Sequence, residues 1–79
     1  MKITLDPKYN IAYVFLKEKT GTVNSIKLSE EVVIDLAPDG SLYGIELLNA
    51  NEQINADNKG NIQFINLLSG NSQILKIAD

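Results

Sequence analysis

The stretch of sequence that decides the fold is Leu36-Ala37-Pro38-Asp39-Gly40-Ser41-Leu42-Tyr43-Gly44-Ile45-Glu46, in which turn residues lie between two apolar runs. The turn is Pro38-Asp39-Gly40, where the glycine permits the positive φ that a tight turn needs. The runs on either side, at 32–36 and 42–48, therefore predict the two strands of a β-hairpin. Gly44 interrupts the second run, which indicates a β-bulge or the close approach of another backbone.

Further strands are predicted on the N-terminal side of this hairpin. Residues 2–5 are short and β-prone, and the turn residues at 6–10 should join them to the next strand. Residues 11–16 form a nearly unbroken β-branched and aromatic run, which predicts a central strand covered on both faces. Residues 23–28 mix polar and apolar side chains and therefore suit an edge strand.

The faces of the predicted sheet follow from the register of its central hairpin. If Leu36 pairs with Leu42, the alternation of side chains divides the apolar residues between the two faces. One face would carry Val33, Ile45 and Leu47, and the other would carry Ile34, Leu36, Leu42 and Leu48. Because both sets are apolar, the sequence predicts that both faces of the sheet need cover.

The C-terminal third of the chain has two interpretations. Residues 61–69 have the apolar spacing of a short helix that ends at Gly70, but the same residues also suit a strand. Residues 40–54 and 60–74 align with seven identities, which favours a second hairpin.

In that second hairpin, the turn would be Asp57-Asn58-Lys59-Gly60 and the last strand would cover 73–77. The polar segment at 49–61 is then a connection between the two parts of the chain. The predicted fold is mainly β, an antiparallel meander of hairpins. The alternative is an α+β fold in which 61–69 form one short helix.

Composition restricts the classes of function. The 79 residues predict a single domain of a size near the lower limit for independent stability, so oligomerisation is an expected source of further stability. The chain has no cysteine and no histidine, which excludes disulfides and metal sites built from thiolate or imidazole. The absence of arginine and the net charge of -3 argue against direct binding of nucleic acid.

Hydropathy argues against a membrane protein. No window approaches the roughly 18 apolar residues that a membrane-spanning helix needs. Residues 1–7 show no basic segment followed by a long apolar run, as a secretory signal would. The sequence therefore predicts a soluble, cytoplasmic protein with no membrane partner.

Few residues are candidates for chemistry. Asp35 and Glu46 each interrupt an apolar strand, and burial would raise the pKa of either carboxyl toward catalytic usefulness. We favour the structural alternative, in which each side chain reaches the rim of the sheet or hydrogen-bonds a neighbouring backbone group. We therefore predict no catalytic, metal-binding or cofactor-binding residue. The question of an enzyme stays open, and we favour the answer that the chain is not one.

Residues 55–60 are similar to the opening of a calcium loop, because oxygen ligands alternate and glycine stands at the sixth position. Lys59 occupies a ligand position, however, and Asn66 replaces the closing bidentate acid. A turn is therefore the predicted structure of this segment.

Several short motifs occur in order at fitting spacing, namely Met1-Lys2-Ile3-Thr4, Asp6-Pro7, Ile11-Ala12-Tyr13-Val14, Val33-Ile34-Asp35, Asp39-Gly40 and Gly44-Ile45-Glu46-Leu47-Leu48-Asn49-Ala50. With this pattern, residues 1–50 resemble the prokaryotic domain of unknown function 2283 family, whereas 51–79 diverge from it. The resemblance implies a β-rich architecture and transfers no catalytic residue, because the family has no established activity. Its members look like genes often found beside small toxin-like proteins, which implies an antitoxin-like or accessory binding role.

Two classes of function therefore compete. The favoured one is an interaction module that forms a homo-oligomer or binds a small partner protein. The acidic balance of the chain would suit a basic partner. The alternative is a minimal ligand-binding protein or carboxylate-based enzyme, with Asp35, Glu46 or a tyrosine in a cleft between protomers.

Overall fold

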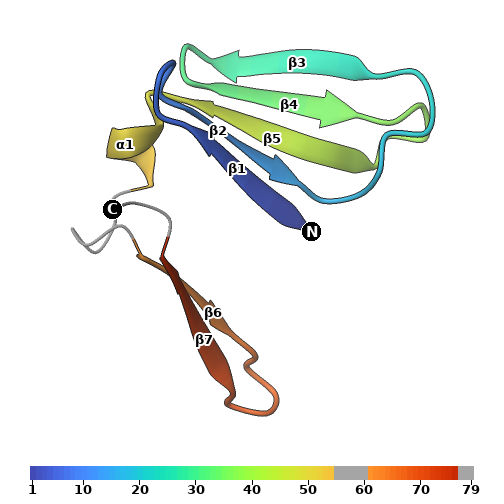
Figure 1. The fold of residues 1–79 in the computed structure, drawn as a ribbon. Helices are drawn as coiled ribbons and strands as arrows, with labels where there is room; N and C mark the ends of the chain where they lie inside the picture. The colour runs from blue at the N-terminus through green and yellow to red at the C-terminus, as the bar shows by residue number, and fades with distance from the viewer. Residues whose placement is uncertain (55–60, 77–79) are drawn as a thin grey trace.

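The computed structural model describes residues 1–54 and 61–76, and its main element is a five-stranded antiparallel sheet (Figure 1). The strands of this sheet are β1 (Lys2–Asp6), β2 (Ile11–Phe15), β3 (Asn24–Ser29), β4 (Val32–Leu36) and β5 (Leu42–Leu48). Their order across the sheet is β1-β2-β5-β4-β3. The mainly β fold predicted from the sequence is thus confirmed, and β3 lies at an edge as expected.

The prediction that residues 11–16 form a central strand is confirmed in that β2 is not an edge strand, although the middle strand of the five is β5. β2 is an interior strand, paired with β1 on one side and with β5 on the other. Its long apolar run reflects two aromatic side chains rather than burial between two layers. The rings of Tyr13 and Phe15 contact each other on one face of β2, with centroids 4.4 Å apart.

The hairpin of β4 and β5 has a shift in register that the sequence did not reveal. Leu36 pairs with Leu42 as predicted, but the register changes between Asp35 and Leu36, so that Ile34 pairs with Ile45. The extra residue on β5 is Tyr43, whose side chain is only 2% exposed. Because of this shift, the predicted division of apolar residues between the two faces is wrong.

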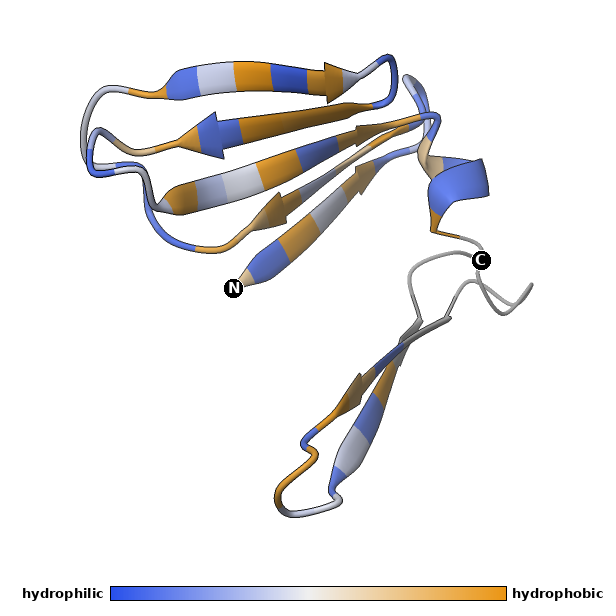
Figure 2. Cartoon of the chain, turned by 180° about the vertical axis from the view of Figure 1, so that it is seen from behind, coloured by the Kyte–Doolittle hydropathy of each residue, from blue (hydrophilic) through white to orange (hydrophobic). Residues whose placement is uncertain are grey.

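The observed register produces two rows of apolar residues on one face, here called the apolar face. The first row crosses all five strands, and the second crosses four of them. The rows are Ile3, Val14, Ile45, Ile34 and Ile26, and then Leu5, Ala12, Leu47 and Val32. Along the edge strands β1 and β3, the alternation of apolar and polar residues is visible in Figure 2.

The opposite face, here called the polar face, carries mixed rows. These rows are Lys2, Phe15, Gly44, Asp35 and Ser25, and then Thr4, Tyr13, Glu46, Val33 and Lys27. The shifted register collects most aliphatic side chains of the sheet on the apolar face, while Ile11, Val33 and Leu48 remain on the polar face. That both faces need cover stays a prediction.

A short helix follows the sheet where the sequence predicted only a polar connection. It is α1 (Ala50–Gln53), which packs at the end of β5. Asn49 turns the chain with a left-handed backbone, φ 53°, and the N–H of Ala50 donates to the carbonyl of Asn10 at 3.0 Å. A four-residue helix has too little periodicity to be recognised from sequence.

A hairpin in the C-terminal part is confirmed, but its turn lies after residue 65 rather than before residue 61, because it consists of β6 (Asn61–Ile65) and β7 (Ser72–Lys76). Its turn spans residues 66–71, between the two strands. The turn predicted at Asp57-Asn58-Lys59-Gly60 and the calcium-like segment at 55–60 lie outside the described residues.

No helix within 1–54 or 61–76 is long and apolar enough to cross a membrane.

Candidate functional site

Asp35 is the buried charged side chain of the described structure and the centre of a polar cluster. It lies on the polar face of β4 and is 8% exposed. Its Oδ2 accepts hydrogen bonds from the hydroxyl of Tyr13 at 2.5 Å and from Nζ of Lys19 at 3.1 Å. Its Oδ1 accepts a hydrogen bond from the hydroxyl of Ser25 at 2.6 Å. The carboxylate thus has a partner on each oxygen.

Three different elements bring these donors to Asp35. Ser25 lies directly opposite on the edge strand β3, and Lys19 belongs to the connection between β2 and β3. Tyr13 comes from β2, on the far side of β5, and its side chain must cross that strand. It can cross because the residue of β5 paired with Asp35 is Gly44.

Gly44 leaves room for the ring of Tyr13. A Cβ atom added to Gly44 would lie 2.5 Å from Cε1 of Tyr13, 2.7 Å from its hydroxyl and 2.6 Å from the carbonyl oxygen of Val14. These distances are shorter than any normal contact of a side chain. The close approach expected at this glycine is therefore present, and it involves a neighbouring side chain as well as a backbone.

The electrostatics of the cluster favour a charged Asp35. Burial raises the pKa of Asp35, but the hydrogen bonds from Ser25, Tyr13 and Lys19 and the charge of the lysine lower it by more, so the pKa lies below its ordinary value. Burial, together with the hydrogen bond to Asp35, raises the pKa of Tyr13. The hydrogen bonds with Tyr13 and Asp35 also raise the pKa of Lys19.

These shifts describe a structural cluster rather than an acid–base pair. A carboxylate with a lowered pKa is a weak base, and a tyrosine with a raised pKa holds its proton more firmly. The cluster instead joins β2, β3 and β4 to the connection that carries Lys19. The partners of Asp35 are thus side chains, whereas from the sequence we expected the rim of the sheet or a backbone group.

Glu46 does not join this cluster. It lies on the polar face in the next row, between Tyr13 of β2 and Val33 of β4, and its side chain is half-buried. No hydrogen bond involves its carboxylate within the part of the chain that the structure describes. The two candidate carboxylates therefore share a face without forming a pair.

The sequence did not identify the partners of Asp35. Gly44 pairs with Asp35 because of the shift at Tyr43, and Ser25 does so because of a second register shift between Lys27 and Ser29 on β3. Local sequence patterns reveal neither shift. Lys19 lies in an irregular connection, where no periodicity indicates the direction of a side chain. In the described ranges, no group of three or more carboxylates is placed to hold a metal ion.

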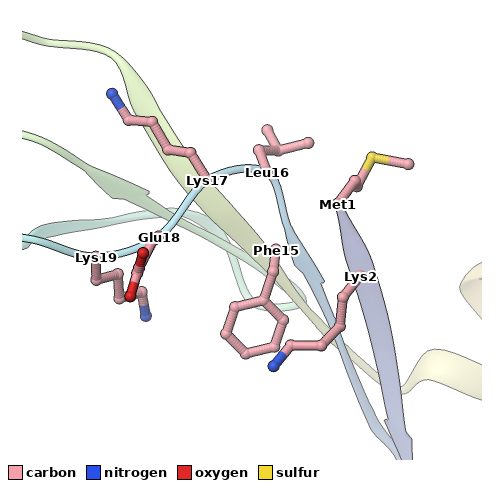
Figure 3. A pocket seen from close by; sticks show the side chains of 7 residues that line it. All are labelled: Met1, Lys2, Phe15, Leu16, Lys17, Glu18 and Lys19. Carbon is pink, nitrogen blue, oxygen red and sulfur yellow. The ribbon is translucent and has the colours of Figure 1, made fainter.

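A groove of about 440 Å³ lies beside the ends of β1 and β2 (Figure 3). The residues that line it are Met1, Lys2, Phe15, Leu16, Lys17, Glu18 and Lys19. Lys19 therefore faces both the Asp35 cluster and this groove. The lining combines an aromatic ring and aliphatic side chains with three ammonium groups.

Comparison with known proteins gives one match. A family model described as "Protein of unknown function (DUF2283)" matches residues 2–51 of the 79-residue chain. No curated protein and no solved structure matches the chain. The matched range contains the complete five-stranded sheet and the Asp35 cluster.

Proposed function

We propose that the chain, which belongs to the DUF2283 family of proteins of unknown function, is a self-associating module whose apolar face packs against the same face of a second copy. The observation that carries this proposal is the row of Ile3, Val14, Ile45, Ile34 and Ile26, which crosses all five strands without a polar residue.

The apolar face has no second layer within the described structure. A stable domain normally buries the apolar face of a sheet against another layer of secondary structure. Here the described helix α1 packs at the end of β5 and hydrogen-bonds Asn10 and Glu31 in the neighbouring turns, and β6 pairs with β7. Apart from Tyr43, the buried hydrophobic residues are the alanines Ala12, Ala37 and Ala50. The sheet therefore lacks the large buried side chains of a two-layer core.

A second copy of the sheet matches this face in size. With strands about 4.8 Å apart and about 3.3 Å per residue, the face measures roughly 24 Å by 17 Å. Two such faces together present about 800 Å² of flat area, and more accessible area because side chains are corrugated. This flat area approaches about 1,000 Å², the lower limit that a biological interface should exceed. Two copies would form a β-sandwich with an interior about 10 Å thick.

Charge also favours a second copy over a different protein on this face. The two apolar rows contain no charged residue, so they offer nothing that would select a charged partner. The net charge of -3 arises from residues elsewhere in the chain. A basic partner protein, as the antitoxin-like role implied by the family resemblance would require, would instead be attracted to the remaining surface.

Two neighbouring residues of β4 provide a matched test. Ile34 lies on the apolar face and Val33 lies on the polar face. Ile34→Lys should place a charge in the middle of the interface and convert a dimer into a monomer, whereas Val33→Lys should leave the dimer intact. Light scattering coupled to size-exclusion chromatography measures both masses. A wild-type monomer at millimolar concentration would contradict the proposal.

A second measurement keeps the test valid if Ile34→Lys fails to fold. The melting temperature of a wild-type dimer should rise with protein concentration, because association stabilises the folded state by mass action. A melting temperature that is constant over a hundredfold range of concentration would indicate that folding does not depend on association.

A further inference from the structure

The groove beside β1 and β2 is cationic in a chain that is acidic overall. Three of the seven lysines of the chain line it, together with one acid, Glu18. Within the described residues, the carboxylate of Glu18 lies outside salt-bridge distance of every ammonium group. The positive charge of the groove is therefore only partly neutralised.

Two of the lysines point toward the same aromatic ring. Nζ of Lys2 lies 4.4 Å from the centroid of the Phe15 ring, and Nζ of Lys19 lies 5.9 Å from it. Figure 3 shows both ammonium groups on the same side as this ring, with Lys17 turned away. The ammonium of Lys17 instead donates to the hydroxyl of Ser41.

Lys2 is the lysine of the groove whose ammonium group keeps hydrogen-bond donors available for a ligand. Lys19 donates to Asp35 at 3.1 Å, so its charge is shared with the polar cluster. In the structure described for 1–54 and 61–76, Lys2 has no carboxylate within 4.0 Å, and its Nζ lies over the face of Phe15. A cation on an aromatic face keeps donors free for an incoming anion.

We propose that this groove binds a carboxylate group attached to an apolar body, with Lys2 as its main charge partner and Lys19 as a second. The ring of Phe15, on the same side as these ammonium groups in Figure 3, supplies the wall for the apolar part. A carboxylate is favoured over a phosphate, because the groove has no arginine, no glycine-rich loop and no helix N-terminus.

The part of the groove formed by Lys2 and Phe15 remains open in the proposed dimer, because both residues lie on the polar face. This inference is therefore independent of the self-association proposal. The carboxylate could belong to a free small acid or to a glutamate side chain within a peptide, and the two sources share the same recognition chemistry.

The test is an NMR titration of the full chain at constant ionic strength. The probes are sodium phenylacetate and the peptide acetyl-Leu-Glu-Leu-amide, each compared with its neutral amide, phenylacetamide or acetyl-Leu-Gln-Leu-amide. At least one acid should shift the amide signals of residues 15–19 in a saturable manner, with a Kd of about a millimolar, whereas its amide should not. The acid that binds more tightly identifies the source.

Lys8 supplies the matched control for Lys2. It belongs to the same hairpin and its Nζ lies 5.3 Å from the Tyr9 ring, but it does not line the groove. Lys2→Gln should weaken binding of the acid by about three- to fivefold, whereas Lys8→Gln should not change it. Absence of saturable shifts, equal shifts from acid and amide, or equal weakening in both variants would overturn the proposal.

Discussion

The hydroxyl of Tyr13 on β2 reaches the carboxylate of Asp35 on β4 at 2.5 Å, although β5 lies between their strands. The phenol ring passes over Gly44, the residue of β5 that pairs with Asp35. A single position without a side chain thus allows a hydrogen bond between two strands that are not neighbours.

Gly44→Ala should destabilise the protein because it places a methyl group where the Tyr13 ring and the carbonyl of Val14 lie. Relief of these contacts requires movement of the ring and weakens its hydrogen bond to Asp35. We expect a loss of about 1–3 kcal/mol in the free energy of unfolding, the usual range for overpacking. Urea denaturation followed by circular dichroism measures this loss.

Gly21→Ala is the control for that substitution. A Cβ atom at Gly21 would lie 3.7 Å from the hydroxyl of Tyr43, which is an ordinary contact distance. The urea midpoint of this variant should stay close to that of the wild type. Equal midpoints for the two alanine variants would show that the close approach at Gly44 has no energetic consequence.

Tyr13→Phe should remove one of the donors to the buried Asp35 while keeping the ring in place. The expected loss is about 1–2 kcal/mol in the free energy of unfolding. Because this hydrogen bond lowers the pKa of Asp35, the substitution should also raise that pKa, which carbon NMR of the carboxyl group measures. Tyr9→Phe, at a residue that is 64% exposed, should change neither quantity.

Asp35→Asn and Glu46→Gln should differ strongly although both convert a carboxylate of the polar face into an amide. The Asp35 variant loses its ion pair with Lys19 and leaves a donor of the cluster without an acceptor, at a cost of about 1–3 kcal/mol. The Glu46 variant breaks no described hydrogen bond, so its urea midpoint should change little. A larger effect at Glu46 would show that its carboxylate has a partner in solution.

The strands of this protein are predictable because each carries a strong local signal. The turn at Gly40 has the expected positive φ of 87°, and the edge position of β3 follows from its mixture of polar and apolar residues. Local signals do not show which residues lie on each face of the sheet. The faces depend on the extra residue at Tyr43, and a change of one position in register exchanges the faces of a strand.

The candidate site was predictable only in part. Asp35 is conspicuous in the sequence because it interrupts an apolar strand, and the structure places it at the centre of a cluster. Its partners Tyr13, Ser25 and Lys19 are 10 to 22 positions away along the chain. Such contacts follow from the order and register of the strands, which no local pattern specifies.

The pH dependence of stability should show a plateau with a fall on each side. Asp35 has a lowered pKa in the folded state, so its contribution is full above its ordinary pKa of 3.8 and disappears as the pH falls through the lowered value. Tyr13 and Lys19 have raised pKa values, so their contributions are full below about pH 10 and disappear as the pH rises through those values.

Urea midpoints between pH 2 and pH 11 measure this profile, and Tyr13→Phe should reduce the fall on the alkaline side. Part of the fall on the acid side should persist in Asp35→Asn, because hydrogen bonds from Ser41 also lower the pKa of Asp39. An alkaline fall that is identical in Tyr13→Phe and the wild type would indicate that other groups cause it.

Asn66→Ala should loosen the β6–β7 hairpin without affecting the five-stranded sheet. The side-chain oxygen of Asn66 accepts hydrogen bonds from the N–H groups of Leu68 and Ser69, at 3.0 and 3.2 Å, and thereby shapes the turn. A two-stranded hairpin is only marginally stable, so loss of these bonds should strongly increase its open population. Amide exchange measured by NMR should accelerate for residues 61–76 and stay unchanged for β1 to β5. Asn71→Ala, at the other end of the turn, should leave exchange unaltered, because the turn uses the backbone of Asn71 rather than its side chain.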